Sequence, residues 1–180
     1  VKMSSKKLSI RKYESKRSLI SELTSSIEII LRDSIKKRQQ ALMIVSGGST
    51  PKTLFEDLSE IDLPWEKVTI LLADERWLPT NHSASNEKLV NDFLLKNRAI
   101  KANFIGLKTE HGSTFEGLPY CEKKLKGVIN PDLLILGMGL DGHTASYFSV
   151  DTDLKDKLSM DSKLKCSRVN LENENFERVT

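Results

Sequence analysis

Hydrophobic residues follow two patterns along this chain, short uninterrupted runs and longer stretches with helical spacing. The short runs predict strands at Ala41–Val45, Val68–Leu72, 104–107 and 133–136. The last run has no polar interruption, which is typical of a strand buried on both faces of a sheet. Apolar residues three or four positions apart predict helices over 18–40, 52–58, 87–95 and 115–128. Alternation over 8–13 predicts an edge strand.

Strands that alternate with helices predict an α/β fold with a parallel sheet. Right-handed crossovers return successive strands in the same direction, so the loops at their carboxyl ends should emerge at one edge. We therefore expect one domain over residues 1–180, with a doubly wound, mostly parallel, Rossmann-like sheet and helices on both faces. Residues 149–165 predict an exposed loop or short helix, and 166–180 predict one or two strands.

Composition excludes several classes of protein. The 180 residues are 38% hydrophobic, enough for a sizeable core. A formal net charge of +3 is too small to indicate a nucleic-acid partner. No apolar run is long enough for a signal peptide or a membrane span, so no membrane partner is expected. Cys121 and Cys166 form no CxxC pair, which favours a reducing compartment, and we expect a cytoplasmic protein.

The first strand is followed by the run Ser-Gly-Gly-Ser-Thr-Pro, which predicts an anion site. Gly47, Gly48, Ser49 and Thr50 would present free backbone N–H groups and hydroxyls at a helix N-terminus, where phosphate is the usual ligand. Thr50 is the expected N-cap, and Pro51 suits the first helical turn. The run is neither a Walker loop nor a nucleophile elbow, so Ser49 is expected to donate hydrogen bonds. A tight turn without a ligand is the alternative.

The second strand is followed by Asp-Glu-Arg-Trp, which begins at Asp74. Arg76 suits phosphate because its planar guanidinium can donate to two oxygens at once. Trp77 is expected to pack rather than to bind a ligand. A surface salt-bridge cluster is the alternative interpretation of this run. Ser85 or Asn86 is expected to cap the helix that follows.

The run after the fourth strand, Gly-Met-Gly-Leu-Asp-Gly-His-Thr, contains the main candidate for chemistry. Gly139 and Gly142 permit sharp turns and a close approach to a ligand. Asp141 and His143 follow where a helix is expected to begin, at the edge of the sheet where ligands bind in open α/β folds. A histidine with an ordinary hydrogen bond is the alternative.

Two other functions for these residues are disfavoured. Gly137, Gly139 and Gly142 match the dinucleotide fingerprint, but that fingerprint belongs after the first strand and needs an acidic residue about 20 positions later at a strand end. His82, His111 and His143 lack metal-ligand spacing, so we expect no metal site.

These runs, in this order, resemble the 6-phosphogluconolactonase family, within the superfamily that includes glucosamine-6-phosphate deaminase. The resemblance rests on SGGSTP at 46–51, DERWLP at 74–79, SNEK at 85–88, LGMGLDGHTASYF at 136–148 and RVT at 178–180. The deaminase branch typically has DEY in the second run and NGHIAF in the fourth. Arg76 and Asp141 differ from that pattern, and the lactonase branch fits better.

The resemblance implies hydrolysis of 6-phosphogluconolactone to 6-phosphogluconate, a step of the oxidative pentose phosphate pathway, without a cofactor. His143 would be the general base for water, kept neutral by a helix N-terminus. Asp141 would act oppositely, by stabilising the charged ring after it takes the proton. The sequence does not decide which influence is larger.

The resemblance also assigns the substrate-binding residues. Arg76, with Ser49 and Thr50, would bind the phosphate, and Arg178 would contribute from the late RVT segment. Backbone N–H groups around Gly47, Gly48 and Ser49, or around Gly139, would hold the oxyanion. Asp74, Asn86 and Gly142 lie in the same motifs and complete the candidate set.

The chain departs from the family pattern upstream of Arg178. Many lactonases carry a lysine and a proline run there, whereas this chain has ENENF at 172–176. Phosphate affinity is therefore expected to be weaker, or to depend more on Arg168 or Arg178. The family continues beyond this point, so we expect the last sheet and helix elements to be missing.

Two alternative functions stay open. One is a deaminase in which Asp74 abstracts a carbon-bound proton, and the other is a non-catalytic sugar-phosphate sensor. The sequence does not determine the oligomeric state.

Overall fold

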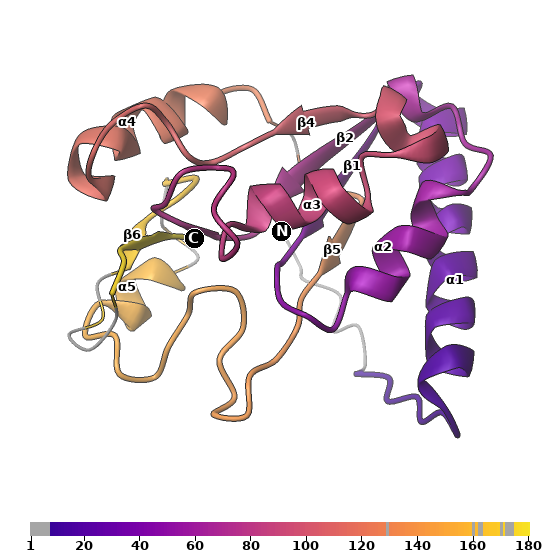
Figure 1. The fold of residues 1–180 in the computed structure, drawn as a ribbon, viewed down its shortest axis with the longest axis horizontal. Coiled ribbons are helices and arrows are strands. Elements are labelled where there is room, and N and C mark those ends of the chain that lie inside the picture. Colours follow the sequence, from indigo (N-terminus) through magenta and orange to yellow (C-terminus); the bar gives the residue numbers. More distant parts are fainter. Residues whose placement is uncertain (1–7, 129, 160, 162–163, 170, 172–174) are drawn as a thin grey trace.

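The computed structural model describes residues 8–128, 130–159, 161, 164–169, 171 and 175–180. Its main sheet is parallel and has the strand order β4-β2-β1-β5 (Figure 1). The strands are β1 (Ala41–Val45), β2 (Val68–Leu72), β4 (Asn103–Ile105) and β5 (Leu133–Ile135). This arrangement confirms the expected α/β fold.

Helices account for most of the remaining regular structure. They are α1 (Lys16–Arg38), α2 (Lys52–Ser59), α3 (Asn86–Phe93), α4 (Thr114–Lys124) and the short α5 (Leu154–Lys157), with 3-10 turns η1 (Trp65–Lys67) and η2 (Asn97–Lys101). In Figure 1, α1 and α2 lie at the right, α3 lies next to α2 near the middle, and α4 lies at the left. The helices expected from periodicity are confirmed, with ends that differ by a few residues.

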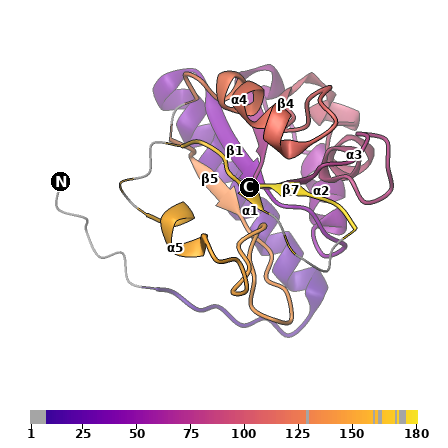
Figure 2. The same ribbon diagram turned by 90° about the vertical axis from the view of Figure 1, so that its left-hand side faces the viewer.

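A second, antiparallel sheet joins the carboxyl edge of the main sheet to the end of the chain. It has the order β3-β7-β6, formed by β3 (Glu75–Arg76), β7 (Arg178–Val179) and β6 (Arg168–Val169). Figure 2 shows the C-terminus next to β7. The Thr180 hydroxyl donates to the carbonyl oxygen of Ala73, just after the end of β2, at 3.3 Å.

The core lies mainly between the sheet and α1 and α2. Met43, Val45 and Ile70 are fully buried on one face of the sheet, and Leu31 of α1 and Phe55 of α2 are fully buried beside them. Full burial of large aliphatic and aromatic side chains is the main driving force for this packing.

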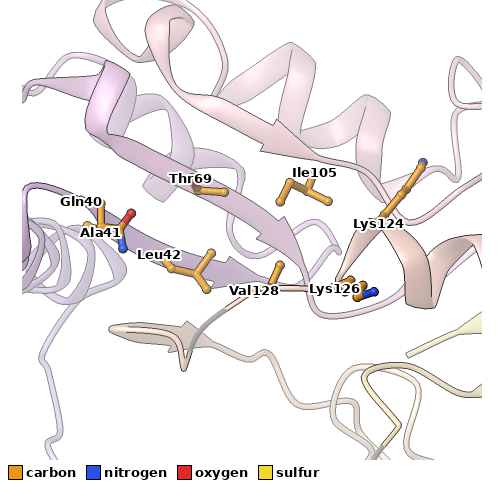
Figure 3. Close-up of a pocket in the computed structure, with 9 residues that line it drawn as sticks. Gln40, Ala41, Leu42, Thr69, Ile105, Lys124, Lys126 and Val128 are labelled. Carbon is orange, nitrogen blue, oxygen red and sulfur yellow. The ribbon is translucent and has the colours of Figure 1, made fainter.

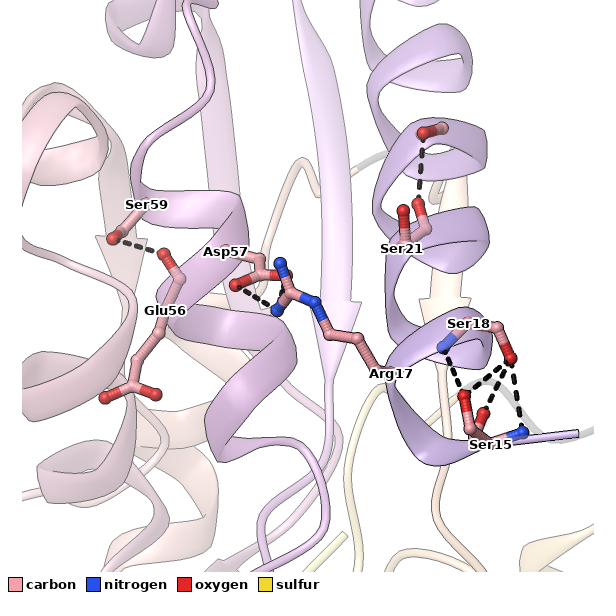
Figure 4. Close-up of polar contacts among 8 residues, drawn as sticks. Ser15, Arg17, Ser18, Ser21, Glu56, Asp57 and Ser59 are labelled. Carbon is pink, nitrogen blue, oxygen red and sulfur yellow. Dashed lines mark hydrogen bonds and ion pairs between the residues drawn. The ribbon is translucent and has the colours of Figure 1, made fainter.

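Polar contacts fix the start of α1 and its position against α2 (Figure 4). The Ser15 hydroxyl accepts from the Ser18 backbone N–H at 3.1 Å and forms a capping box with it. Arg17 pairs with Asp57 of α2 at 3.0 Å. Such an exposed pair contributes at most about 1 kcal/mol, so the apolar interface must supply most of the stability.

A pocket of about 300 Å³ lies over one face of the main sheet (Figure 3). Leu42, Thr69 and Ile105 line it from the strands. Lys124 lines it from the end of α4, and Lys126 lines it from the connection to β5. None of the candidate site residues lies there, so the pocket does not bear on the predicted chemistry.

Two strand predictions are wrong. Residues 8–13 form no strand, and Leu8 and Ile10 are more than three-quarters exposed because no neighbouring strand pairs with them. The run at 133–136 is not buried on both faces, because β5 is an edge strand of the described sheet and Leu134 is 49% exposed.

The prediction that Thr50 is the N-cap of α2 is also wrong. Pro51, not Thr50, occupies the N-cap position, and no side chain caps this helix. The first-turn N–H groups of α2 are therefore not satisfied by a capping hydroxyl.

Within the described ranges, no helix combines the length and the apolar character needed to cross a lipid bilayer.

Candidate active site

A pocket of about 390 Å³ lies at the carboxyl edge of the parallel sheet. The loops after β1, β2 and β5 all reach it, as expected for parallel strands that end at the same edge. Of the candidate residues, the pocket is lined by Gly47, Gly48, Ser49, Thr50, Asp74, Arg76, Asn86, Gly139, His143 and Arg178. Asp141 and Gly142 do not line it.

The imidazole of His143 is held between a carboxylate and an aromatic ring. Its Nδ1 lies 2.6 Å from Asp141 Oδ1, and its ring stacks on Phe148 with centroids 4.3 Å apart. The hydrogen bond from His143 lowers the pKa of the Asp141 carboxyl below its ordinary value. An ionised carboxylate only accepts, so Nδ1 carries the proton and Nε2 is left as the basic nitrogen.

The helix expected to begin after His143 is absent from the structure. Residues 144–147 form a tight turn, in which the Tyr147 N–H donates to the Thr144 carbonyl oxygen at 2.9 Å. Ala145 has φ +49°, and this left-handed residue prevents a continuous right-handed helix after His143. The prediction that a helix N-terminus keeps the His143 ring neutral is therefore wrong. Asp141 is the group that orients the ring.

Gly139 allows the loop to fold back against the imidazole. Its N–H donates to the His143 carbonyl oxygen at 2.9 Å. A Cβ at this position would lie 2.4 Å from the His143 ring. Glycine is required here because the backbone and the ring approach so closely.

Two arginines face each other across the antiparallel sheet beside the pocket. Arg76 of β3 pairs directly with Arg178 of β7. Arg76 Nη1 donates to the Ala84 carbonyl oxygen at 2.7 Å, but its buried Nε has no hydrogen-bond partner among the described residues. The Arg178 guanidinium lies 5.3 Å from the centre of the Phe148 ring. Both arginines line the pocket, and a planar guanidinium suits an anion because it can donate to two oxygens at once.

Asp74 lies buried where three loops meet. Its Oδ2 accepts from the Ser146 hydroxyl at 2.7 Å, and its Oδ1 accepts from Asn86 Nδ2 at 3.2 Å. Asn86 Nδ2 also donates to the Asp74 carbonyl oxygen at 2.9 Å. Hydrogen bonds to its charged form stabilise a carboxylate that is only 4% exposed.

The neighbouring Glu75 is fully buried and holds β3 against the start of α3. Its carboxylate accepts from the N–H groups of Arg76, Asn86 and Glu87 at 2.7 to 2.8 Å, and from the Ser85 hydroxyl at 3.0 Å. Burial raises the pKa of this carboxyl above its ordinary value, while the three N–H donors act in the opposite direction. Ser85 is the N-cap of α3, one of the two caps expected.

Two serines of the site were not singled out from the sequence. The Ser46 hydroxyl accepts from the Gly137 N–H at 3.0 Å, which joins the ends of β1 and β5. Ser146 joins the His143 turn to Asp74. Both lie inside recognised motifs, but only the tertiary contacts distinguish them from the other hydroxyls there.

Trp77 and Arg168 lie outside the pocket. Trp77 is buried and its indole N–H donates to the His111 carbonyl oxygen at 3.0 Å, which confirms a packing role. Arg168 does not reach the pocket, because its Nε donates to the Thr114 hydroxyl at 3.1 Å and its guanidinium lies over Phe115. The departure from the family pattern at 172–176 cannot be placed, because residues 172–174 lie outside the described residues.

Across the part of the chain that is described, no three or more His, Cys, Asp or Glu side chains gather in a way that could hold a metal ion.

Gly47 is expected to be intolerant of any side chain. A Cβ there would lie 1.8 Å from Asn86 Oδ1, and Asn86 is only 2% exposed. We expect Gly47→Ala to lower the free energy of unfolding, measured in urea, by about 1–3 kcal/mol because the buried amide must move. Gly112→Ala is the matched control, since its Cβ would lie 3.9 Å from the nearest atom. An equal loss in both variants would contradict the close contact.

The fold and the pocket define an α/β protein with a crevice, lined by Arg76 and Arg178, at the carboxyl edge of its parallel sheet. The chain belongs to the family described as glucosamine-6-phosphate isomerases/6-phosphogluconolactonase, whose model matches residues 14–180. The family predicted from the sequence motifs is thereby confirmed.

Individual relatives are lactonases by name. The chain is 46% identical over 119 residues to 6-phosphogluconolactonase of Pseudomonas aeruginosa, covering 66% of this chain and 50% of that protein. It is 37% identical over 150 residues to the Pseudomonas putida 6-phosphogluconolactonase, covering 83% and 62%. The crystal structure of a 6-phosphogluconolactonase from Shewanella baltica has a TM-score of 0.92 and 36% identity, covering 97% of this chain and 75% of that one. The chain thus spans about half to two-thirds of the length of these curated relatives.

Proposed function

We propose that this chain hydrolyses 6-phosphogluconolactone to 6-phosphogluconate, a step of the oxidative pentose phosphate pathway. One observation supports this most directly. A carboxylate-bound histidine and a pair of facing arginines line the same pocket of about 390 Å³. The names of the relatives identify the matching substrate.

The arginines provide the binding end of the proposed site. Arg76 and Arg178 both line the pocket, and their guanidinium groups would bind the phosphate of the substrate. The hydroxyls of Ser49 and Thr50, next to the N-terminus of α2, would complete the phosphate contacts.

His143 provides the chemical end. Its Nε2 would take a proton from water as the water oxygen attacks the lactone carbonyl carbon. The ring ester C–O bond then breaks, and the departing oxygen takes the proton back from the imidazolium to become a hydroxyl. Asp141 would stabilise the imidazolium between these two steps, because its carboxylate accepts from Nδ1 at 2.6 Å.

The oxyanion of the tetrahedral intermediate needs N–H donors. The Gly139 N–H already donates to the His143 carbonyl oxygen. Of the two donor sets considered, we therefore propose the backbone of Gly47, Gly48 and Ser49.

The proposed function is tested by measuring lactone hydrolysis with and without the chain. The expected result is a rate that is proportional to protein concentration, saturates with substrate and exceeds spontaneous hydrolysis. A rate equal to the spontaneous one would overturn the proposal. Ammonia release from glucosamine 6-phosphate is not expected, because Arg76 and Asp141 depart from the motifs typical of the deaminase branch.

We also propose that the reaction takes place in the cytoplasm. Cys121 and Cys166 are both buried free thiols, which persist in reducing compartments.

A further inference from the structure

Ser146 lies at the centre of the turn that presents His143, and its side chain points away from solvent. It is fully buried, while His143 and Phe148 lie on either side of it in sequence and stack on each other. We propose that Ser146 is a positioning residue that holds this turn, and with it the imidazole, in the reactive orientation. The inference rests on the lactonase function proposed above.

Two hydrogen bonds attach Ser146 to separate parts of the fold. Its hydroxyl donates to Asp74 Oδ2 at 2.7 Å, which links the turn to the loop after β2. Its N–H donates to the Thr180 hydroxyl at 3.4 Å, and that hydroxyl donates in turn to the Ala73 carbonyl oxygen. The bond to Asp74 is the shorter one, and it is strengthened by the charge of the acceptor.

The turn needs such an attachment because its backbone is strained. Ala145, immediately before Ser146, has φ +49°, which is unfavourable for a residue with a Cβ. Strained conformations persist only where the surrounding structure holds them. The Ser146 hydroxyl supplies a buried, charge-assisted contact directly beside the strained residue.

The arginine side of the pocket has its own anchors. Arg76 donates to the Ala84 carbonyl oxygen, and its N–H donates to the buried Glu75 carboxylate. Loss of the Ser146 hydroxyl should therefore displace the imidazole and leave the phosphate contacts of Arg76 in place. A positioning role for Ser146 therefore predicts a lower kcat with little change in KM. A general structural role would change both.

The test compares Ser146→Ala with Ser59→Ala. Ser59 is also fully buried and its hydroxyl donates to the Glu56 carbonyl oxygen at 2.7 Å, but it lies outside the pocket. We expect Ser146→Ala to lower kcat by about 10- to 100-fold, as expected for a misplaced catalytic group. KM, and the Kd for 6-phosphogluconate, should stay within about threefold of wild type. Ser59→Ala should lower Tm and leave kcat unchanged.

Several outcomes would overturn the inference. They are an unchanged kcat in Ser146→Ala, a rise in KM alone, or an equal loss of kcat in Ser59→Ala. A wild-type chain without activity would instead overturn the proposed function. In that case the His143 ring resonances still report on the turn by NMR, and they should shift in Ser146→Ala but not in Ser59→Ala.

A double-mutant cycle with Asp74→Ala tests the contact itself, because alanine removes both acceptor oxygens. If Ser146 acts through Asp74, the double variant should be no slower than the slower single variant, because the contact can be lost only once. Additive losses would show that Ser146 acts by another route and would overturn the assignment. Should Ser146→Ala fail to fold, the nearly isosteric Ser146→Cys replaces it, with the same expected loss because a thiol is a weak donor.

Discussion

His143→Ala is expected to lower kcat for lactone hydrolysis by about 10²–10⁴-fold, the usual contribution of a general base. The His143 imidazole lines the pocket, and Asp141 binds its Nδ1. Removal of the imidazole therefore leaves the attacking water without a general base. Binding of 6-phosphogluconate should persist, because Arg76 of β3 and Arg178 of β7 are unchanged in this variant. The Kd for 6-phosphogluconate, measured by calorimetry, should therefore stay within about threefold of wild type.

His111→Ala is the matched control for this variant. The His111 ring packs against Tyr120 and lies outside the pocket, so its removal should leave kcat unchanged. A His143→Ala variant that hydrolyses the lactone at the wild-type rate would contradict the assignment of the base. Binding without any turnover in the wild-type chain would instead indicate a sugar-phosphate sensor.

Arg76→Ala is expected to raise KM, and the Kd for 6-phosphogluconate, by about 10- to 150-fold. This corresponds to the roughly 1.5–3 kcal/mol of a hydrogen bond to a charged group. The expected change in kcat is less than about threefold, because the phosphate is bound equally in the ground and transition states. Gluconate, which lacks the phosphate, should bind the wild-type chain and the variant equally weakly.

Arg168→Ala provides the comparison for Arg76→Ala. Both residues were candidates for phosphate binding from the sequence, but Arg168 contacts Thr114 and Phe115 instead of the pocket. Its replacement should leave KM unchanged. Equal effects of the two substitutions on KM would show that the facing arginines of β3 and β7 do not form the phosphate site.

Local patterns were sufficient for most of the regular structure. The buried runs at Ala41–Val45 and Val68–Leu72 became the central strands of the sheet, and the long helical pattern became α1. These predictions succeeded because hydrophobic periodicity reports directly on burial. The strand expected at 8–13 failed because alternation alone does not supply a pairing partner.

The environment of the candidate base was less predictable. A helix was expected after His143, but Ala145 adopts a left-handed conformation within a turn. The ring is consequently oriented by Asp141 rather than by a helix N-terminus. A left-handed alanine is unfavourable in isolation, so its presence depends on contacts that are distant in sequence.

The sequence by itself determined the fold class, the family and which loops contain the candidate site, because these follow from local periodicity and from motifs of adjacent residues. Only the tertiary structure decided that Arg76 faces Arg178 and that Ser146 binds Asp74. Those pairs are separated by many residues along the chain. Their contacts depend on strand order and burial, which no local pattern encodes.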